Sequence, residues 1–163
     1  MSLSAFVTGG SGFVGMNLLH QLVEQGWQVT ALVREHSPLE DIRDLDITLV
    51  EGDITDAQSL TGAIPEGVDC VFHVAASTSI WSQQNEMQTR INVEGTRNVV
   101  EAASAAHAGR LVHCSSFVVW GFHEELLSEE SSRLENADWI NYVRTKHEAE
   151  LIVKEAVAQR RLD

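Results

Sequence analysis

The chain has 163 residues, 44% of them hydrophobic, and a formal net charge of -13 at pH 7. This length suits one hydrophobic core, so we expect a single domain over residues 1–163, and no apolar run reaches the roughly 18 residues that span a bilayer. The acidic balance repels nucleic acid and anionic membranes, and the N-terminus lacks the features of a signal peptide, so we expect a cytoplasmic protein with neither as a partner.

A short apolar strand, residues 3–7, is the first predicted element, and the glycine-rich stretch Thr8-Gly9-Gly10-Ser11-Gly12-Phe13-Val14-Gly15 follows it. Apolar residues then recur with helical spacing over residues 13–23, so the glycines join a strand to a helix. Glycines at such a junction let the chain turn tightly and approach a pyrophosphate, while the first N–H groups of the helix face the anion. Gly10, Gly12 and Gly15 fit the pattern G-x-G-x-x-G, whereas Gly9, Gly12 and Gly15 form a set with a spacing of three residues. The alternative to both interpretations is a flexible loop before a helix.

Strands and helices alternate along the rest of the chain. Near-continuous apolar strands separated by helices predict an α/β fold, a doubly wound parallel sheet with helices on both faces and right-handed crossovers. The further predicted strands are residues 27–33, 47–50, 69–76 and 110–114, and the further predicted helices are residues 39–45, 57–64, 85–106 and 138–159, with a loop at 117–136. Cys70 and Cys114 fall in apolar strands without metal-ligand spacing, so we expect buried free thiols and no metal site.

The end of the second strand carries the signal for cofactor choice. An acidic residue about 20 positions after the glycines holds the ribose of NAD, but Val33 stands near this position and Arg34 follows it. Because Arg supplies planar, permanently charged donors, this pair favours the 2′-phosphate of NADP. The preference would reverse if Glu35 faced the ribose, and an arginine on a ligand-free surface is the other alternative. Asp53, at the end of the third strand, reaches the adenine side of such a site or caps a turn.

Three polar residues in the second half form a candidate catalytic set. Tyr142, the only tyrosine, and Lys146 are four residues apart on a predicted helix and therefore share one face. Ser115 and Ser116 end the fifth strand at the carboxyl edge, where open parallel sheets bind their ligands. An ammonium beside a phenol lowers the phenol's pKa, so Tyr142 could pass a proton while Ser116 holds a carbonyl or hydroxyl and Lys146 also binds the nicotinamide ribose. A surface pair on a helix and a strand-end turn are the structural alternatives.

Six segments together resemble the extended short-chain dehydrogenase/reductases, also called the NAD-dependent epimerase/dehydratase family. They are residues 8–15, 52–56, 73–76, 92–99, 115–116 and 142–146. The resemblance implies a Rossmann fold with Ser116, Tyr142 and Lys146 as the catalytic residues. It also implies a cofactor, NADP by preference or NAD, that lies along Gly9, Gly12, Phe13, Val14, Gly15, Arg34, Asp53, Ile54, Ala75, Ala76, Asn92, Ser115, Tyr142 and Lys146.

Within this family, the Val33-Arg34 strand end and the His-Val-Ala-Ala segment at 73–76 are most similar to the dihydroflavonol-reductase and hydroxysteroid-dehydrogenase branch. This branch implies an oxidoreductase acting on a carbonyl or secondary alcohol of a small molecule. A nucleotide-sugar epimerase or dehydratase that retains NAD and a dinucleotide-binding module without turnover are the alternatives. Family members continue into further strands and a smaller substrate domain, so we expect this chain to lack those parts. A homodimer through residues 85–106 and 138–159 is a further expectation.

Overall fold

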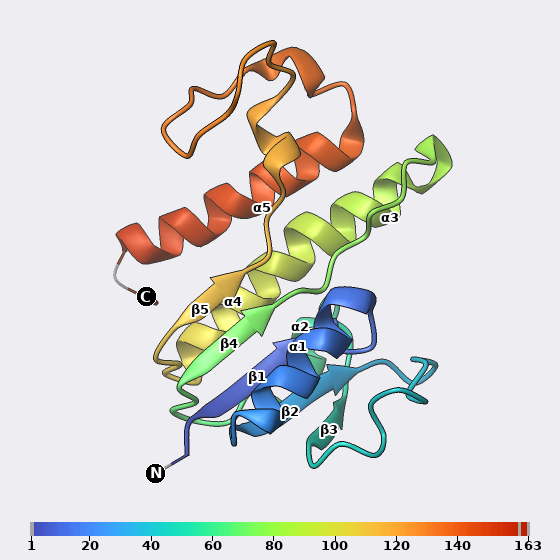
Figure 1. The fold of residues 1–163 in the computed structure, drawn as a ribbon, viewed down its shortest axis with the longest axis vertical. Helices are drawn as coiled ribbons and strands as arrows, with labels where there is room; N and C mark the ends of the chain where they lie inside the picture. Colours follow the sequence, from blue (N-terminus) through green and yellow to red (C-terminus); the bar gives the residue numbers. More distant parts are fainter. Residues whose placement is uncertain (1, 160, 163) are drawn as a thin grey trace.

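The computed structural model describes residues 2–159 and 161–162 of the chain. Its strands form one parallel sheet in the order β3-β2-β1-β4-β5 (Figure 1). The strands are β1 (Ser4–Thr8), β2 (Gln28–Val33), β3 (Thr48–Glu51), β4 (Cys70–His73) and β5 (Leu111–His113). The chain order reverses between β1 and β4, and parallel sheets bind ligands at the carboxyl edge of such a reversal. The predicted doubly wound α/β fold is confirmed.

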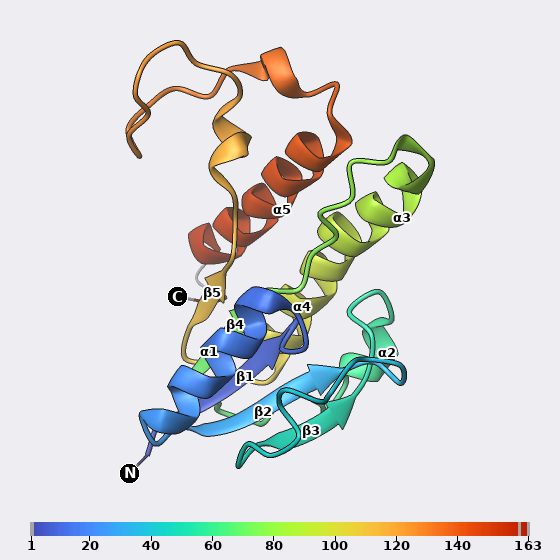
Figure 2. The ribbon, with the colours of Figure 1, turned by 45° about the vertical axis from the view of Figure 1, so that its right-hand side comes forward.

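Helices cover both faces of the sheet (Figure 2). α1 (Phe13–Glu24) lies on one face, and α4 (Gly95–Ala105) lies on the other, with α5 (Asn141–Ala158) packed beside it. The remaining helical elements are α2 (Ala57–Leu60), α3 (Asn85–Thr89), a π-helical segment (Arg90–Glu94) and the 3₁₀ helices Ser82–Gln84, Phe117–Trp120 and Glu135–Ala137.

The two cores follow from the alternation of side chains along the central strand. Ala5 and Val7 point to one face of the sheet, where they pack with Leu19 of α1. Phe6 points to the opposite face and packs with Val99 of α4. Because successive residues of a strand face opposite sides, a fully apolar β1 requires helices on both faces. These two apolar layers fix the sheet that carries the candidate site at its edge.

Two predicted helices are wrong or shortened. Residues 39–45 form turns, in which the amide of Arg43 bonds the Leu39 carbonyl at 2.9 Å. These turns already bury the spaced apolar side chains, Leu39, Ile42 and Leu45, in the core on the α1 face of the sheet. A segment this short forms a stable helix only with difficulty, because helix nucleation is costly. The helix predicted over 57–64 ends at Leu60, because Thr61 is extended and Gly62 has a left-handed φ of 75°.

The helix predicted over 85–106 is interrupted by the π-helical segment that contains Asn92. A π-helical turn inserts an extra residue and so rotates a side chain relative to the helix axis. Asn92 is thereby buried against the loop that follows β4. The strand predicted over 69–76 ends at His73, and helix α5 begins at Asn141 instead of 138.

Within the described part of the chain, no helix combines the length and the apolar composition needed to cross a membrane. Nor do three His, Cys, Asp or Glu residues gather there in a way that could hold a metal ion. Cys70 is buried, as expected, whereas Cys114 is exposed. The prediction for Cys114 is wrong because the residue follows β5, which lies at one edge of the described sheet.

Candidate functional site

Tight packing requires glycine at two positions of the turn between β1 and α1. Gly9 has a left-handed φ of 75°, and a Cβ there would lie 2.6 Å from the backbone nitrogen of Ala75. A Cβ at Gly15 would collide with the Gly9 carbonyl, so α1 approaches the turn closely. At Gly10 the obstacle is a flexible side chain, since a Cβ would lie 2.8 Å from Cδ1 of Leu19. Gly9 and Gly15 are therefore the two positions of the turn at which backbone atoms exclude any side chain.

Gly12 differs from these glycines because packing leaves room for a side chain. The nearest atom to a Cβ at Gly12 is the Gly9 carbonyl oxygen, at 3.4 Å. Gly12 is the N-cap of α1 and provides no side-chain cap, and the first N–H groups of a helix have no partner within it. The apolar side chains of Phe13 and Val14 are 82% and 55% exposed on this first turn. An open glycine in front of unpaired N–H groups is a cradle that fits a pyrophosphate.

Arg34 begins a tight turn at the end of β2. Its amide donates to Oγ of Ser37 at 2.9 Å, and the Ser37 amide donates back to the Arg34 carbonyl, also at 2.9 Å. Arg34, Glu35 and His36 line a cavity of about 270 Å³. Oε2 of Glu35 lies 3.9 Å from Nε2 of His36, whereas Arg34 forms no ion pair with any described residue. The Arg34 side chain is therefore without an ion-pair partner among the described residues at the carboxyl end of β2.

Asp53 and Ile54 follow β3 and are already engaged by the protein. Oδ1 of Asp53 accepts the Thr55 amide at 2.8 Å, so the turn-capping role is present. Ile54 is buried, and a Cβ at Gly95 would lie 2.7 Å from its Cδ1. Gly95 therefore lets the start of α4 pack closely on Ile54.

Asn92 holds together two segments beside the site. Its Oδ1 accepts the Ser77 amide at 2.7 Å, and its Nδ2 donates to the Ser77 carbonyl at 3.0 Å and to Oγ1 of Thr145 at 3.1 Å. Thr145 in turn donates to the Tyr142 carbonyl at 3.1 Å. Asn92 thus connects the loop that follows Ala75 and Ala76 with the helix that carries Tyr142.

Lys146 brings α5 to the end of β5. Its side chain is only 3% exposed, and Nζ donates to the Cys114 carbonyl at 2.7 Å, next to Ser115 and Ser116. Burial lowers the pKa of Lys146, while electrostatic interactions with Cys114 and Glu150 oppose this shift. Tyr142 lies half-buried one turn earlier on the same helix face. Within the described residues, the hydroxyls of Tyr142 and Ser116 donate to no protein group, which leaves both free to bind a ligand.

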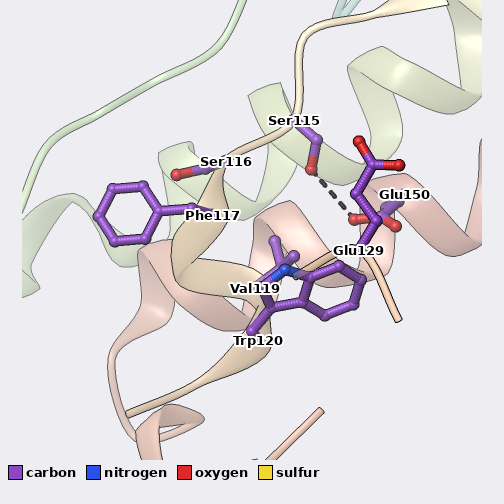
Figure 3. Close-up of a pocket in the computed structure, with 7 residues that line it drawn as sticks. All are labelled: Ser115, Ser116, Phe117, Val119, Trp120, Glu129 and Glu150. Atoms are coloured by element: carbon purple, nitrogen blue, oxygen red, sulfur yellow. Dashed lines mark hydrogen bonds between the residues drawn. The ribbon is translucent and has the colours of Figure 1, made fainter. Parts of the chain in front are cut away.

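The two serines that follow β5 point in different directions (Figure 3). Ser115 donates to Oε2 of Glu150 at 3.1 Å, while Ser116 points away from that carboxylate. Sequence reasoning missed Glu150, although its position four residues after Lys146 places both on one helix face. The serines border an open cavity of about 510 Å³, whose lining consists of Ser115, Ser116, Phe117, Val119, Trp120, Glu129 and Glu150. Tyr142 and Lys146 lie outside this lining.

A family model described as the NAD dependent epimerase/dehydratase family matches residues 5–163. The chain belongs to this family. It is similar to a protein of Synechocystis sp. named putative dihydroflavonol 4-reductase, with 44% identity over 116 residues, 71% of this chain and 33% of that protein. A farnesyl-dihydroquinoline-oxide ketoreductase of Stigmatella aurantiaca is 37% identical over 155 residues, 94% of this chain and 46% of the relative.

A solved structure of a short-chain dehydrogenase/reductase superfamily protein from Agrobacterium tumefaciens with bound NAD matches with a TM-score of 0.79. It is 31% identical, and the match covers 94% of this chain and 44% of that structure. The chain thus spans between one third and about one half of the length of these three relatives. The predicted family is confirmed, and an NAD(P) dinucleotide is typical of the NAD dependent epimerase/dehydratase family. The open position at Gly12 leaves space in which the pyrophosphate of such a cofactor would fit.

Proposed function

We propose that this family member is an NADP-preferring oxidoreductase that interconverts a carbonyl and a secondary alcohol on a small molecule. The observation that supports the proposal is the bond that the buried Lys146 donates to the carbonyl of Cys114, two residues before Ser116, while Tyr142 precedes Lys146 by one helical turn. The two relatives described above have reductase or ketoreductase in their names, which supports a carbonyl as the reacting group.

The roles of the three side chains follow from their chemistry. When bound, the nicotinamide supplies or accepts a hydride at the reacting carbon. In the reducing direction, Tyr142 would give its phenolic proton to the carbonyl oxygen of the substrate. The ammonium of Lys146 stabilises the phenolate that remains, and the Ser116 hydroxyl donates a hydrogen bond to the same carbonyl oxygen.

Replacing Tyr142 tests this mechanism. We expect Tyr142→Phe in the native protein to reduce the rate of NADPH-dependent ketone reduction about 100-fold or more, because the proton donor is lost. The assay follows NADPH oxidation with a panel of ketones that includes a dihydroflavonol, and NADPH binding by the variant is the control. Normal turnover by Tyr142→Phe would contradict the proposed role of Tyr142.

The NADP preference rests on Arg34, which lines the cavity at the end of β2 and has no ion pair among the described residues. Without this group, a 2′-phosphate loses a planar, charged donor. We therefore expect Arg34→Ala to weaken NADP binding about tenfold and to leave NAD binding nearly unchanged in a fluorescence titration. Arg43→Ala is the control, because Arg43 is exposed and paired with Asp44. Equal losses for both cofactors, or NAD that co-purifies tightly, would favour the epimerase or dehydratase alternative.

The proposed homodimer would use the outer faces of α3, α4 and α5. Leu151 and Val157 of α5 are apolar and exposed, which supports a contact there. Light scattering on the native protein measures the oligomeric state, and a monomer over the whole concentration range would contradict the dimer.

A further inference from the structure

The histidine that ends β4 is buried and bonded through both ring nitrogens. His73 is 1% exposed, with Nδ1 lying 2.7 Å from Oγ1 of Thr8 and Nε2 lying 2.9 Å from Oγ1 of Thr96. Thr8 is the last residue of β1, immediately before the glycine turn, and Thr96 lies in the first turn of α4. The imidazole therefore bridges the central strand and the helix behind it.

The neighbouring bonds determine which ring nitrogen carries the hydrogen. The Thr96 hydroxyl lies 2.6 Å from the Asn92 carbonyl, a distance at which it must donate its one hydrogen to that oxygen. Thr96 can then only accept from His73, so Nε2 carries the hydrogen. In a neutral ring Nδ1 is an acceptor, and it takes the hydrogen of Thr8. The Thr8 oxygen in turn accepts the amide of Ala75 at 3.3 Å.

The result is a chain of hydrogen bonds in which every donor points the same way, from the Ala75 amide through Thr8, His73 and Thr96 to the Asn92 carbonyl. One end of the chain is the backbone of Ala75, which closes around Gly9 so tightly that a Cβ there would not fit. The other end is Asn92, whose side chain bonds to Ser77 and to Thr145 of α5. This network connects the glycine turn to the helix of Tyr142.

A second proton on His73 would break this order. Nδ1 would become a donor to Thr8, which already accepts the Ala75 amide, and the Thr8 hydroxyl hydrogen would lose its acceptor. The titratable groups that face His73 are His113 of β5, whose ring centroid lies 5.3 Å away, and Lys146 of α5. Thr8 and Thr96, from β1 and α4, are uncharged. Burial, assisted by the charges of His113 and Lys146, lowers the pKa of His73 well below its usual value.

We propose that His73 is a positioning residue of the dinucleotide site, held as the neutral Nε2–H tautomer so that its one-way chain of hydrogen bonds sets the spacing between the glycine turn and the Asn92 segment. His73 touches neither cofactor nor substrate in this role. The inference rests on the proposed function for the identity of the ligand, but the tautomer can be measured without one.

The tautomer is measured by NMR on the chain labelled with ¹⁵N-histidine. We expect the His73 ring nitrogens to show the Nε2–H pattern with no titration between about pH 8 and 5. An Nδ1–H pattern, or a titration near the usual pKa of histidine, would overturn the proposal whatever the chain binds.

The positioning role is tested at Thr96, because replacing the buried His73 itself could prevent folding. Thr96→Val removes the hydroxyl at constant shape, whereas Thr96→Ser keeps it. We expect Thr96→Val to weaken NADP binding about tenfold and Thr96→Ser to change it less than about threefold, the size of effect that one hydrogen bond supports. Thermal unfolding shows that each variant is folded at the temperature of the titration.

Val99→Ala is the matched control, since Val99 is buried in α4 and forms no part of the chain of hydrogen bonds. If Val99→Ala weakened NADP binding as much as Thr96→Val, general loosening of α4 would explain the loss and the proposal would fall. A wild-type chain that bound neither NADP nor NAD would instead overturn the proposed function. Intact NADP binding with a titrating His73 would overturn the positioning role alone.

Discussion

At the glycine turn between β1 and α1 the backbone forms the site, whereas at the end of β5 the side chains form it. Gly9 and Gly15 cannot carry a Cβ, so sterics alone fix the turn. At the other end, two side-chain hydrogen bonds, from Lys146 to the Cys114 carbonyl and from Ser115 to Glu150, join α5 to the end of β5. Folding therefore depends on backbone packing at the turn and on side-chain hydrogen bonds at the serines. The effects of substitutions should differ accordingly.

The largest difference in stability is expected when the same methyl group is placed at two glycines of the turn, Gly9 and Gly12. Gly9→Ala should lower the free energy of unfolding by about 4 kcal/mol, since the left-handed φ costs about 1–2 kcal/mol and the overpacking against Ala75 about 1–3 kcal/mol. Gly12→Ala should cost less than about 1 kcal/mol, because its Cβ meets only one atom at ordinary contact distance. Urea denaturation measures both values.

NADP titration of the same pair completes the test. We expect Gly12→Ala to fold normally and still to bind NADP much more weakly, because its methyl group occupies the space that the pyrophosphate needs. Normal NADP affinity in Gly12→Ala would mean that the pyrophosphate lies elsewhere, and a fully stable Gly9→Ala would contradict the steric account of the turn.

The β5 end carries a buried histidine, His113, that should make stability depend on pH. Burial lowers the pKa of His113 to about 4, and Lys146 adds to the shift while Glu150 opposes it. Neither ring nitrogen of His113 has a hydrogen-bond partner among the described residues. The unfolded chain binds this proton near pH 6.5 and the folded chain only near pH 4, so stability is complete above pH 6.5 and falls as the pH drops.

Integrated over this window, His113 alone should cost about 3 kcal/mol of unfolding free energy by pH 4. His73 and His147 act with the same sign, so His113→Phe should reduce the slope between pH 6.5 and 4.5 without abolishing it. The pKa values of Asp69 and Glu150 are lowered in the folded chain, so protonation of these carboxylates also reduces the free energy of unfolding, but at lower pH than for the histidines. An unchanged slope in His113→Phe, followed by urea denaturation at several pH values, would contradict this assignment.

The same difference between the two ends decides what could be predicted from the sequence. The glycine turn is local, because a strand, a turn and a helix lie within residues 3–23, and its elements form where expected. The contact of Ser115 with Glu150 joins residues 35 apart, and no spacing rule predicts it. The interruption at Asn92 likewise depends on Ser77, a partner in another segment. The helix predicted over residues 39–45 is absent because turns bury the same apolar side chains.

The smallest expected effect concerns the bond that Ser115 donates to Glu150 across the cavity. Glu150 also pairs with Lys154, and this pair is largely open to water on the lysine side. Although burial would raise the pKa of Glu150, its bonds from Lys154 and Ser115 hold it below the usual value. Ser115→Ala should therefore cost only about 0.5–1 kcal/mol of unfolding free energy and raise the pKa of Glu150 slightly. Because Ser116 points away from this carboxylate, Ser116→Ala should leave the pKa of Glu150 unchanged, and ¹³C NMR of the glutamates measures both variants. A shift in Ser116→Ala as large as that in Ser115→Ala would mean that the two serines share one site.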